Sequence, residues 1–227
     1  MVYVWVILWV VFALAVFSVL GWTINITLAQ NKAWSDFADK YKLTKQPKLK
    51  FMDPLAVSGV LHGRRINMYV VSEPVPSRRT TNVYSHIEIF LNEAPKAMML
   101  VGKRLKPMSM SDMSLPHVYN APGIDWALRE TDDVYGMANW MTETRTKALK
   151  AYLDSAGPAD QPLLIADGTQ AFLLWRTAAP LKDPRALNAL CQRLFGIAKE
   201  LDGGASMIVK PNASSEPTPD TAPAATA

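Results

Sequence analysis

The residues whose types and spacing are best suited to chemistry lie in one methionine-rich stretch, Met108, Met110 and Met113, followed by His117. Thioether sulfurs are soft ligands that need no deprotonation, so this pattern suits a soft cation such as Cu(I), and the nearby imidazole would complete the site. Methionine also serves as flexible core filler or as an adaptable apolar surface, and the chain has 11 of them. Cu(I) handling is therefore kept as an alternative function, and it would require a domain outside the cytoplasm.

Three pairs of adjacent basic residues form a second candidate site, and all three fall in expected turns or loops. If these turns meet at one end of a sheet, the pairs would form a basic rim that faces anionic lipid or an acidic patch on a partner. Charged turns are also common simply because turns are solvated, and that is the interpretation we favour. The residues of the basic rim are Arg64, Arg65, Arg78, Arg79, Lys103 and Arg104.

No catalytic arrangement is recognisable in the sequence. His62, His86 and His117 lack the spacing of a metal site, and the chain has neither a G-x-S-x-G elbow nor a glycine-rich phosphate loop. The single cysteine, Cys191, lies on the expected apolar stripe of a helix, where a thiol behaves as a small hydrophobic side chain. The acidic stretch over residues 125–133 is interpreted as a solvated loop rather than a pair of catalytic carboxylates. We therefore expect no catalytic residue and no cofactor.

The element that positions everything else is an apolar stretch at the N-terminus, residues 2–20, which holds no charge and no proline. Its length matches the roughly 20 residues that a helix needs to cross a bilayer. A cleaved signal peptide would carry a positive residue before a shorter apolar core, and Lys32 is the first charged residue here. We therefore predict a retained transmembrane anchor over residues 1–30, which contacts the lipid bilayer through residues 2–20.

Lysine placement predicts the orientation of this anchor. No lysine or arginine precedes it, whereas Lys32, Lys40, Lys42 and Lys45 follow closely. The positive-inside rule then places the N-terminus outside and the following domain in the cytoplasm. A single cysteine permits no intramolecular disulfide, which agrees with a reducing compartment. The net charge of +4 suits a surface near anionic headgroups but falls short of the charge of a typical nucleic-acid-binding domain.

Helical spacing continues beyond the anchor. Aromatic residues from Trp34 to Tyr41 recur on one face between charged residues, which predicts a juxtamembrane amphipathic helix over residues 31–46 that docks on the rest of the chain. A soluble domain over residues 47–209 follows. The tail over residues 210–227 is rich in Pro, Ala, Ser and Thr and has no apolar pattern, so it is predicted to be disordered.

The soluble domain is predicted to be α+β, with a mostly antiparallel sheet covered on one face by two helices. Hairpins are expected around residues 62–64 and 167–169, together with a long alternating strand over residues 80–92. The next strand, residues 97–101, is expected to run antiparallel to it. Less regular segments suggest strands over residues 48–52, 134–141 and 207–209, and a helical turn around Trp126.

The two covering helices are expected over residues 143–156 and over residues 184–202. Thr142 and Asp183 are suited to begin them, because their side-chain oxygens can accept hydrogen bonds from the free N–H groups of a first turn. Pro184 at the first helical position supports the second assignment. In the strand that follows the first turn, the face predicted to lie in the core carries Ile66, Met68 and Val70.

Several of these elements together resemble a group of bacterial single-span membrane-anchored proteins. The resemblance rests on Trp34 in the amphipathic helix and on a G-x-x-x-G-R hairpin, Gly59, Gly63 and Arg64, that leads into the alternating strand. The closing Leu-Leu-Ile-Ala-Asp-Gly hairpin and its helix complete it, over about residues 34–201. The resemblance implies the inner membrane of a bacterium. The group carries no assigned activity, so no catalytic residue is transferred from it.

These features favour a membrane-tethered, non-enzymatic interaction or scaffold domain on the cytoplasmic face. Its partner would be a membrane or cytoplasmic protein, and not a nucleic acid. The alternatives are soft-metal handling through the methionine-rich stretch and an enzyme with no recognisable motif.

Overall fold

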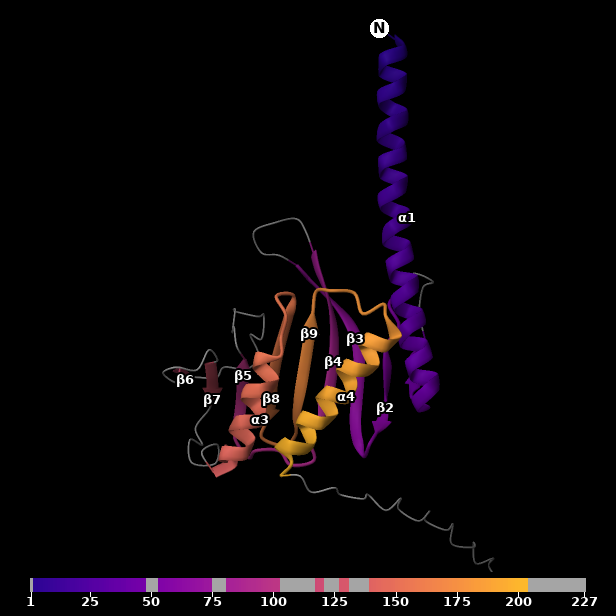
Figure 1. Cartoon of the computed structure of the whole chain (residues 1–227). Coiled ribbons are helices and arrows are strands. Elements are labelled where there is room, and N and C mark those ends of the chain that lie inside the picture. Colours follow the sequence, from indigo (N-terminus) through magenta and orange to yellow (C-terminus); the bar gives the residue numbers. More distant parts are fainter. Residues whose placement is uncertain are drawn as a thin grey trace, which may run out of the picture.

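The computed structural model describes residues 2–47, 53–74, 81–102, 117–120, 127–130 and 139–203. Its longest element is the helix α1 (Val2–Tyr41), whose N-terminal part stands clear of the other helices and strands (Figure 1). At 1.5 Å per residue, this 40-residue helix is about 60 Å long. By length and composition α1 could cross a membrane.

The C-terminal part of α1 is built into the domain core. Trp34 and Ala38 on this part are almost completely buried. The helix ends at Tyr41, earlier than the predicted end at residue 46, because Lys42 has a positive φ of 55° and the chain then enters a short strand. The amphipathic segment is thus the docked end of one continuous helix.

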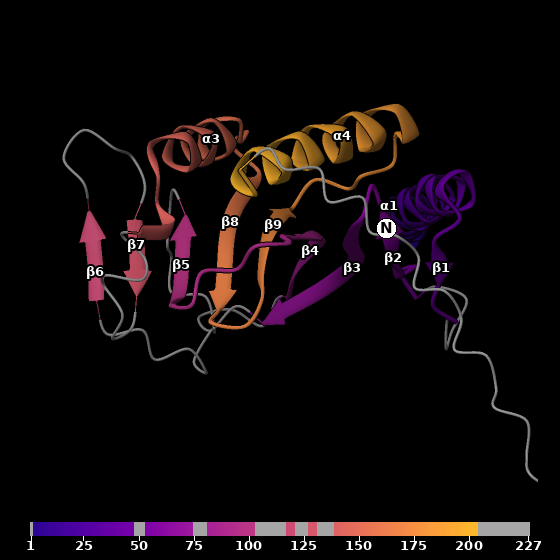
Figure 2. The ribbon, with the colours of Figure 1, turned by 90° about the horizontal axis from the view of Figure 1, so that it is seen from below.

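Within the described residues, nine strands form one sheet in the order β1-β2-β3-β4-β9-β8-β5-β7-β6 (Figure 2). All neighbouring strands are antiparallel. The strands are β1 (Thr44–Lys45), β2 (Val57–Leu61), β3 (Arg64–Pro74), β4 (Thr81–Phe90), β5 (Met98–Gly102), β6 (His117–Asn120), β7 (Ala127–Glu130), β8 (Asp160–Asp167) and β9 (Ala171–Thr177). The α+β class and both predicted hairpins, β2–β3 and β8–β9, are confirmed.

The first hairpin turns at His62 and Gly63, which both have positive φ, at 52° and 74°. A two-residue type I′ turn requires positive φ at both central positions, and its twist matches that of the flanking strands. Of the two residues, Gly63 adopts this conformation without steric cost. Histidine is one of the few non-glycine residues found repeatedly in this region of backbone space.

The middle of the chain departs from the prediction. β5 runs antiparallel to β4, but the β8–β9 hairpin is inserted between them, so β5 pairs with β8. Residues 127–130 form β7 and not part of a helical turn, because pairing with β5 outweighs the local helical pattern. Asn139 and Trp140 are helical, so they do not continue the suggested strand. The remaining predictions, for residues 48–52, 134–138, 207–209 and 210–227, lie outside the described residues.

The helices α3 (Glu143–Asp154) and α4 (Pro184–Leu201) cover one face of the sheet, and the end of α1 packs beside α4 on the same face (Figure 2). Thr142 and Asp183 cap α3 and α4 as predicted, each accepting a hydrogen bond from a first-turn N–H. The main core lies between this layer and the sheet, and its sheet side includes Ile66, Met68, Ile87, Ile89, Leu164, Leu173 and Trp175. The face of the sheet turned away from α1, α3 and α4 is called the distal face below.

Candidate binding site on the distal face

Most of the sequence-predicted site residues lie outside the part of the chain that the structure describes. Met108, Met110 and Met113 lie outside the described residues, and His117 lies in the edge strand β6. Four residues of the suggested basic rim also lie outside the described residues: Arg78, Arg79, Lys103 and Arg104. The other two are adjacent in β3, where successive side chains point to opposite faces of the sheet.

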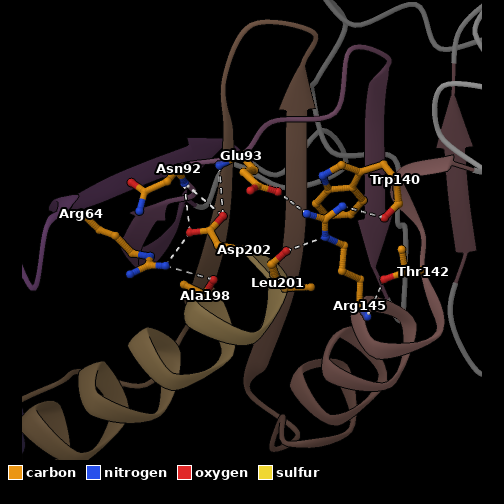
Figure 3. Close-up of polar contacts among 9 residues, drawn as sticks. All are labelled: Arg64, Asn92, Glu93, Trp140, Thr142, Arg145, Ala198, Leu201 and Asp202. Atoms are coloured by element: carbon orange, nitrogen blue, oxygen red, sulfur yellow. Dashed lines mark hydrogen bonds and ion pairs between the residues drawn. The ribbon is translucent and has the colours of Figure 1, made fainter. Parts of the chain in front are cut away.

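The burial of Arg64 contradicts its place in the predicted basic rim, because only 8 % of the residue is exposed. Its Nη2 lies 2.5 Å from Oδ2 of Asp202, at the end of α4 (Figure 3). The same carboxylate accepts hydrogen bonds from the backbone N–H groups of Asn92 and Glu93 at 3.1 Å. Arg145 from α3 forms a further ion pair with the Glu93 carboxylate. Arg64 therefore joins the first hairpin to α4, and it is not available to a partner.

Arg65 lies on the distal face and is exposed. Its guanidinium stacks on the Phe90 ring, with 3.5 Å from Cζ to the ring centroid. Nη2 also donates to Oε1 of Gln170 at 2.8 Å. Arg65 is thus the described member of the suggested rim that faces solvent.

Strand register gathers a polar cluster on the distal face that the sequence did not connect. Across β3 and β4, Asn67 lies opposite Glu88 and Tyr69 lies opposite His86. On the other side of β4, β9 places Arg176 opposite His86. These five residues, which we call the polar cluster, come from three neighbouring strands and lie on one face.

Glu88 is the buried carboxylate of the polar cluster, with 9 % exposed. It accepts hydrogen bonds from Nδ2 of Asn67 at 2.9 Å and from the hydroxyl of Tyr69 at 2.5 Å. Burial, the hydrogen bond to Glu88 and the Glu88 charge all raise the pKa of Tyr69, so the phenol stays protonated and keeps donating. Among the described residues, no lysine, arginine or histidine forms an ion pair with Glu88.

His86 is buried without hydrogen bonds in the described part of the chain. Only 6 % of the residue is exposed, and neither ring nitrogen has a partner. The Tyr69 ring lies 5.2 Å away, centroid to centroid. Burial and the nearby Arg176 charge lower the pKa of His86 from 6.5 to about 4, so the imidazole is neutral at pH 7. A neutral imidazole has one donor and one acceptor, and both are unfilled here.

Arg176 is the cation of the polar cluster, and its charge is already balanced. Its Nη2 lies 2.5 Å from Oε2 of Glu73, and its guanidinium stacks on the Tyr84 ring at 3.6 Å. The residue is 3 % exposed, and Nε has no hydrogen-bond partner in the described structure. Arg176 and Glu73 therefore form a neutral pair, so Arg176 is not the counter-ion of Glu88.

A pocket of about 380 Å³ opens beside the polar cluster, and its lining comes from Gln46, Ala56, Val57, Ser58, Asn67, Met68 and Tyr69. This volume lies at the small end of the range for small-molecule pockets. Asn67 and Tyr69 belong both to the pocket wall and to the hydrogen bonds of Glu88. The lining side chains are all uncharged, so the charge behind the pocket is that of Glu88.

The described side chains of this site carry groups that can bind a ligand or a partner. Within the described ranges, no three His, Cys, Asp or Glu residues gather in a way that could hold a metal ion. Cys191 is buried in the core, where burial raises the pKa of its thiol to about 12 and keeps it protonated. What the site offers is a buried charge, neutral hydrogen-bonding groups and aromatic rings beside a pocket.

Part of this site was visible in the sequence. His86 and Glu88 stand two residues apart on the mixed face of the alternating strand, and Asn67 and Tyr69 stand two apart on the polar face of its neighbour. Two such polar pairs on adjacent strands are a usable signal. What was missing is the register of β3 against β4, which decides that the pairs face each other.

None of the family models, curated proteins or solved structures compared with this chain matches it. Any proposal about function therefore rests on the geometry of α1, the polar cluster and the pocket.

Proposed function

We propose that this protein is a membrane-tethered, non-enzymatic interaction domain whose distal face binds its partner. The observation that carries the proposal is the continuity of α1. The helix that exposes an apolar N-terminal part also buries Trp34 and Ala38 in the core of the domain. Because helix and domain share residues, the domain would be held at one angle to the bilayer. A rigid tether of this kind favours presentation of one chosen face to a partner.

Contact with lipid through residues 2–20 is supported by the exposure of the helix. Large apolar side chains from Tyr3 to Leu20 are exposed on all sides of α1, among them Trp5, Trp9 and Phe17. Soluble surfaces rarely expose a continuous apolar area of this size, and those that do bind membranes or other proteins. A helix that is apolar all round is also the form expected of a membrane span.

The proposed location is the bacterial inner membrane, with the N-terminus outside and the domain in the cytoplasm. The support is the lysine distribution: Lys32, Lys40, Lys42 and Lys45 all follow the apolar part of α1, and all are exposed. Exposed lysines beside the cytoplasmic leaflet are favoured by its negative surface potential.

The distal face is the favoured binding surface because its polar groups are incompletely used. His86 and Arg176 carry nitrogens without hydrogen-bond partners there, and a pocket opens beside them. Buried polar groups normally find partners, so a cluster that lacks them is suited to exchange hydrogen bonds with a bound molecule.

Site-specific photocrosslinking in intact membranes would test this proposal. A photoreactive amino acid is placed at Val60, which is 68 % exposed and lies opposite the distal-face residue Arg65. The matched control is Lys150, an exposed position on α3 in the helical layer. We expect a crosslinked protein of defined mass from Val60 and none from Lys150. Crosslinks from Lys150 alone, or from neither position, would contradict the proposal.

The orientation is tested separately by fusing a reporter that is active only outside the cytoplasm to the C-terminus. We expect no activity from this fusion, and activity from the same reporter placed before residue 2. The reverse pattern would overturn the cytoplasmic placement of the domain and revive the Cu(I) alternative, which needs an extracytoplasmic domain.

A further inference from the structure

Glu88 is a buried acidic residue whose charge is not neutralised by an ion pair within the described structure. Its carboxylate is more than nine-tenths buried, and no cation among the described residues pairs with it. Buried charges in proteins are normally paired with an opposite charge or bound to a metal. Two hydrogen bonds, from Asn67 and Tyr69, reduce this imbalance but bring no positive charge.

The same two hydrogen bonds decide what the pocket offers to a ligand. A carboxylate can only accept, so Asn67 must turn its NH₂ group and Tyr69 its hydroxyl hydrogen toward Glu88. The atoms left over include two acceptors, Oδ1 of Asn67 and the lone pairs of the Tyr69 hydroxyl, beside the second N–H of Asn67. The Ser58 hydroxyl on the same wall can also accept. The pocket therefore offers several acceptors, and behind them lies a carboxylate with no ion-pair partner among the described residues.

None of the described basic residues on the distal face forms an ion pair with Glu88. His86 lies two positions before Glu88 on the same face of β4, but its burial beside Arg176 keeps the imidazole neutral at pH 7. Arg176 is engaged by Glu73 and stacked on Tyr84. Arg65 on the same face stacks on Phe90 and donates to Gln170, and no ion pair joins it to Glu88. A bound cation at the pocket would therefore be the first direct counter-ion of Glu88 among the described groups.

We propose that the pocket over β2 and β3 binds an alkylammonium group, with the acceptors of Ser58, Asn67 and Tyr69 receiving its N–H bonds and Glu88 supplying the countercharge. An ammonium group has three donors and no acceptor, which complements a wall of acceptors. The Tyr69 ring adds a face on which a cation is stabilised. This inference rests on the proposed function, because it assigns a ligand class to the same distal face.

A divalent metal is a poorer match to this site. Calcium and magnesium prefer several carboxylate or carbonyl oxygens in a defined geometry, and magnesium keeps several of its waters. The pocket is backed by one carboxylate, which already accepts two hydrogen bonds. A monovalent cation that donates hydrogen bonds suits one negative charge and neutral acceptors better.

The alkylammonium group has two sources, a small free amine or the side chain of a lysine on a partner protein. Both are probed with the full-length protein in detergent micelles, by following amide NMR shifts of β2 and β3 at low ionic strength, where charge effects are least screened. The free-amine probe is n-butylammonium, and 1-butanol is its uncharged control. The lysine probe is a short blocked peptide containing one lysine, and its control is the same peptide with that lysine acetylated.

We expect n-butylammonium to shift resonances around Ser58 and Tyr69 in a saturable way, and 1-butanol to bind at least about tenfold more weakly, as the loss of one charge-assisted interaction implies. Tighter binding of the lysine peptide than of the free amine would identify a protein side chain as the ligand, and the opposite order a small amine. Equal binding of amine and alcohol, or no saturable shift with either amine, would overturn the proposal.

Three variants assign the effect to the site. Glu88→Gln should weaken amine binding about tenfold or more, because the shape is kept and the countercharge is lost. Asp154→Asn removes one negative charge from α3, in the layer on the other side of the sheet, and should leave binding within about twofold. Ser58→Leu fills the half-buried pocket wall and should abolish binding, which keeps the test valid if Glu88→Gln does not fold. Unchanged affinity in either Glu88→Gln or Ser58→Leu would refute the assignment.

A failure of the alkylammonium proposal can be distinguished from a failure of the proposed function. Amine binding without a crosslink from Val60 would leave the ligand class standing and remove the protein partner. A crosslink from Val60 without amine binding would keep the partner and refute the alkylammonium site.

Discussion

Arg64 and Asp202 form a buried ion pair, 2.5 Å from Nη2 to Oδ2, that fastens the end of α4 to the start of β3 (Figure 3). Both residues are more than nine-tenths buried. The Asp202 carboxylate also accepts from the backbone N–H groups that follow β4, at Asn92 and Glu93. One carboxylate thus connects the first hairpin, the end of β4 and the last helix.

Replacing Arg64 with alanine should lower the free energy of unfolding by about 3–5 kcal/mol, which is typical when one partner of a buried ion pair is removed. The cost arises because Asp202 stays buried without a counter-ion. Urea denaturation of the full-length protein in detergent micelles measures it. The control is Lys150→Ala, which breaks a 3.5 Å pair with Asp154 whose side chains are both about half exposed. Surface pairs contribute about 0–1 kcal/mol, so equal losses in the two variants would contradict the role of Arg64.

The pH dependence of stability should carry a contribution from His86. Its pKa is lowered from 6.5 to about 4 in the folded protein, so the unfolded chain takes up the proton first as the pH falls. The stability that comes from keeping His86 neutral is complete above about pH 6.5 and is lost between pH 6.5 and 4. At 1.36 kcal/mol per pKa unit, the total loss is about 3 kcal/mol.

His86→Gln removes the titrating group and should flatten this part of the curve. Thermal unfolding of both proteins between pH 7.5 and 4 supplies the comparison, and the difference between the two curves isolates His86 from carboxylates that titrate at lower pH. Parallel curves for the two proteins would show that His86 is not held neutral. The variant thus tests whether burial beside Arg176 holds the His86 imidazole neutral.

The fold followed from the sequence where local chemistry and apolar pattern agreed. The hairpin expected around residues 62–64 turns at His62 and Gly63, and Asp183 with Pro184 predicted the start of α4. Alternation placed Ile66 and Met68 in the core. The same alternation already puts Arg64 on the core face, two positions before Ile66, so its burial could have been predicted from the strand pattern alone.

The candidate site could not be predicted in the same way, because it depends on long-range register. No local signal indicates that β9 pairs with β4 and so brings Arg176 to His86. Local sequence also does not indicate that the β8–β9 hairpin separates β4 from β5. Without the register of the neighbouring strands, the residues of the polar cluster cannot be told apart from other polar residues on a strand.

Gly168 in the β8–β9 turn should not tolerate a side chain. Its φ is +87°, and a Cβ added there would lie 3.0 Å from the backbone oxygen of Lys96. Gly168→Ala should therefore lower the free energy of unfolding by at least about 1 kcal/mol. Gly196 on α4 is the matched control, since a Cβ there meets nothing within 4 Å. Gly196→Ala should instead raise stability by about 0.5–1 kcal/mol, as expected for alanine replacing glycine inside a helix. Chemical denaturation measures both, and a stable Gly168→Ala variant would contradict the described turn.

Two truncations of α1 should separate its anchoring part from its core part. Removing residues 1–27 deletes the exposed apolar segment but keeps the contacts where α1 meets the domain. These include the hydrogen bond from Gln30 to Ser85 and that from the Leu55 N–H to Asn31. This variant should move to the soluble fraction and unfold at nearly the same temperature as the full-length protein.

Removing residues 1–41 should instead prevent stable folding, because Trp34 and Ala38 leave the core and the Tyr41 hydroxyl no longer donates to Asn188 on α4. Replacing a buried Trp with alanine alone typically costs about 3–5 kcal/mol, a large part of the stability of an ordinary domain. Fractionation, circular dichroism and thermal melts of the two truncations make the comparison. If the longer truncation folds as well as the shorter one, α1 is a detachable tether and the domain is not held at a fixed angle to the membrane. If only the shorter one folds, anchor and core share one helix, as the proposed function requires.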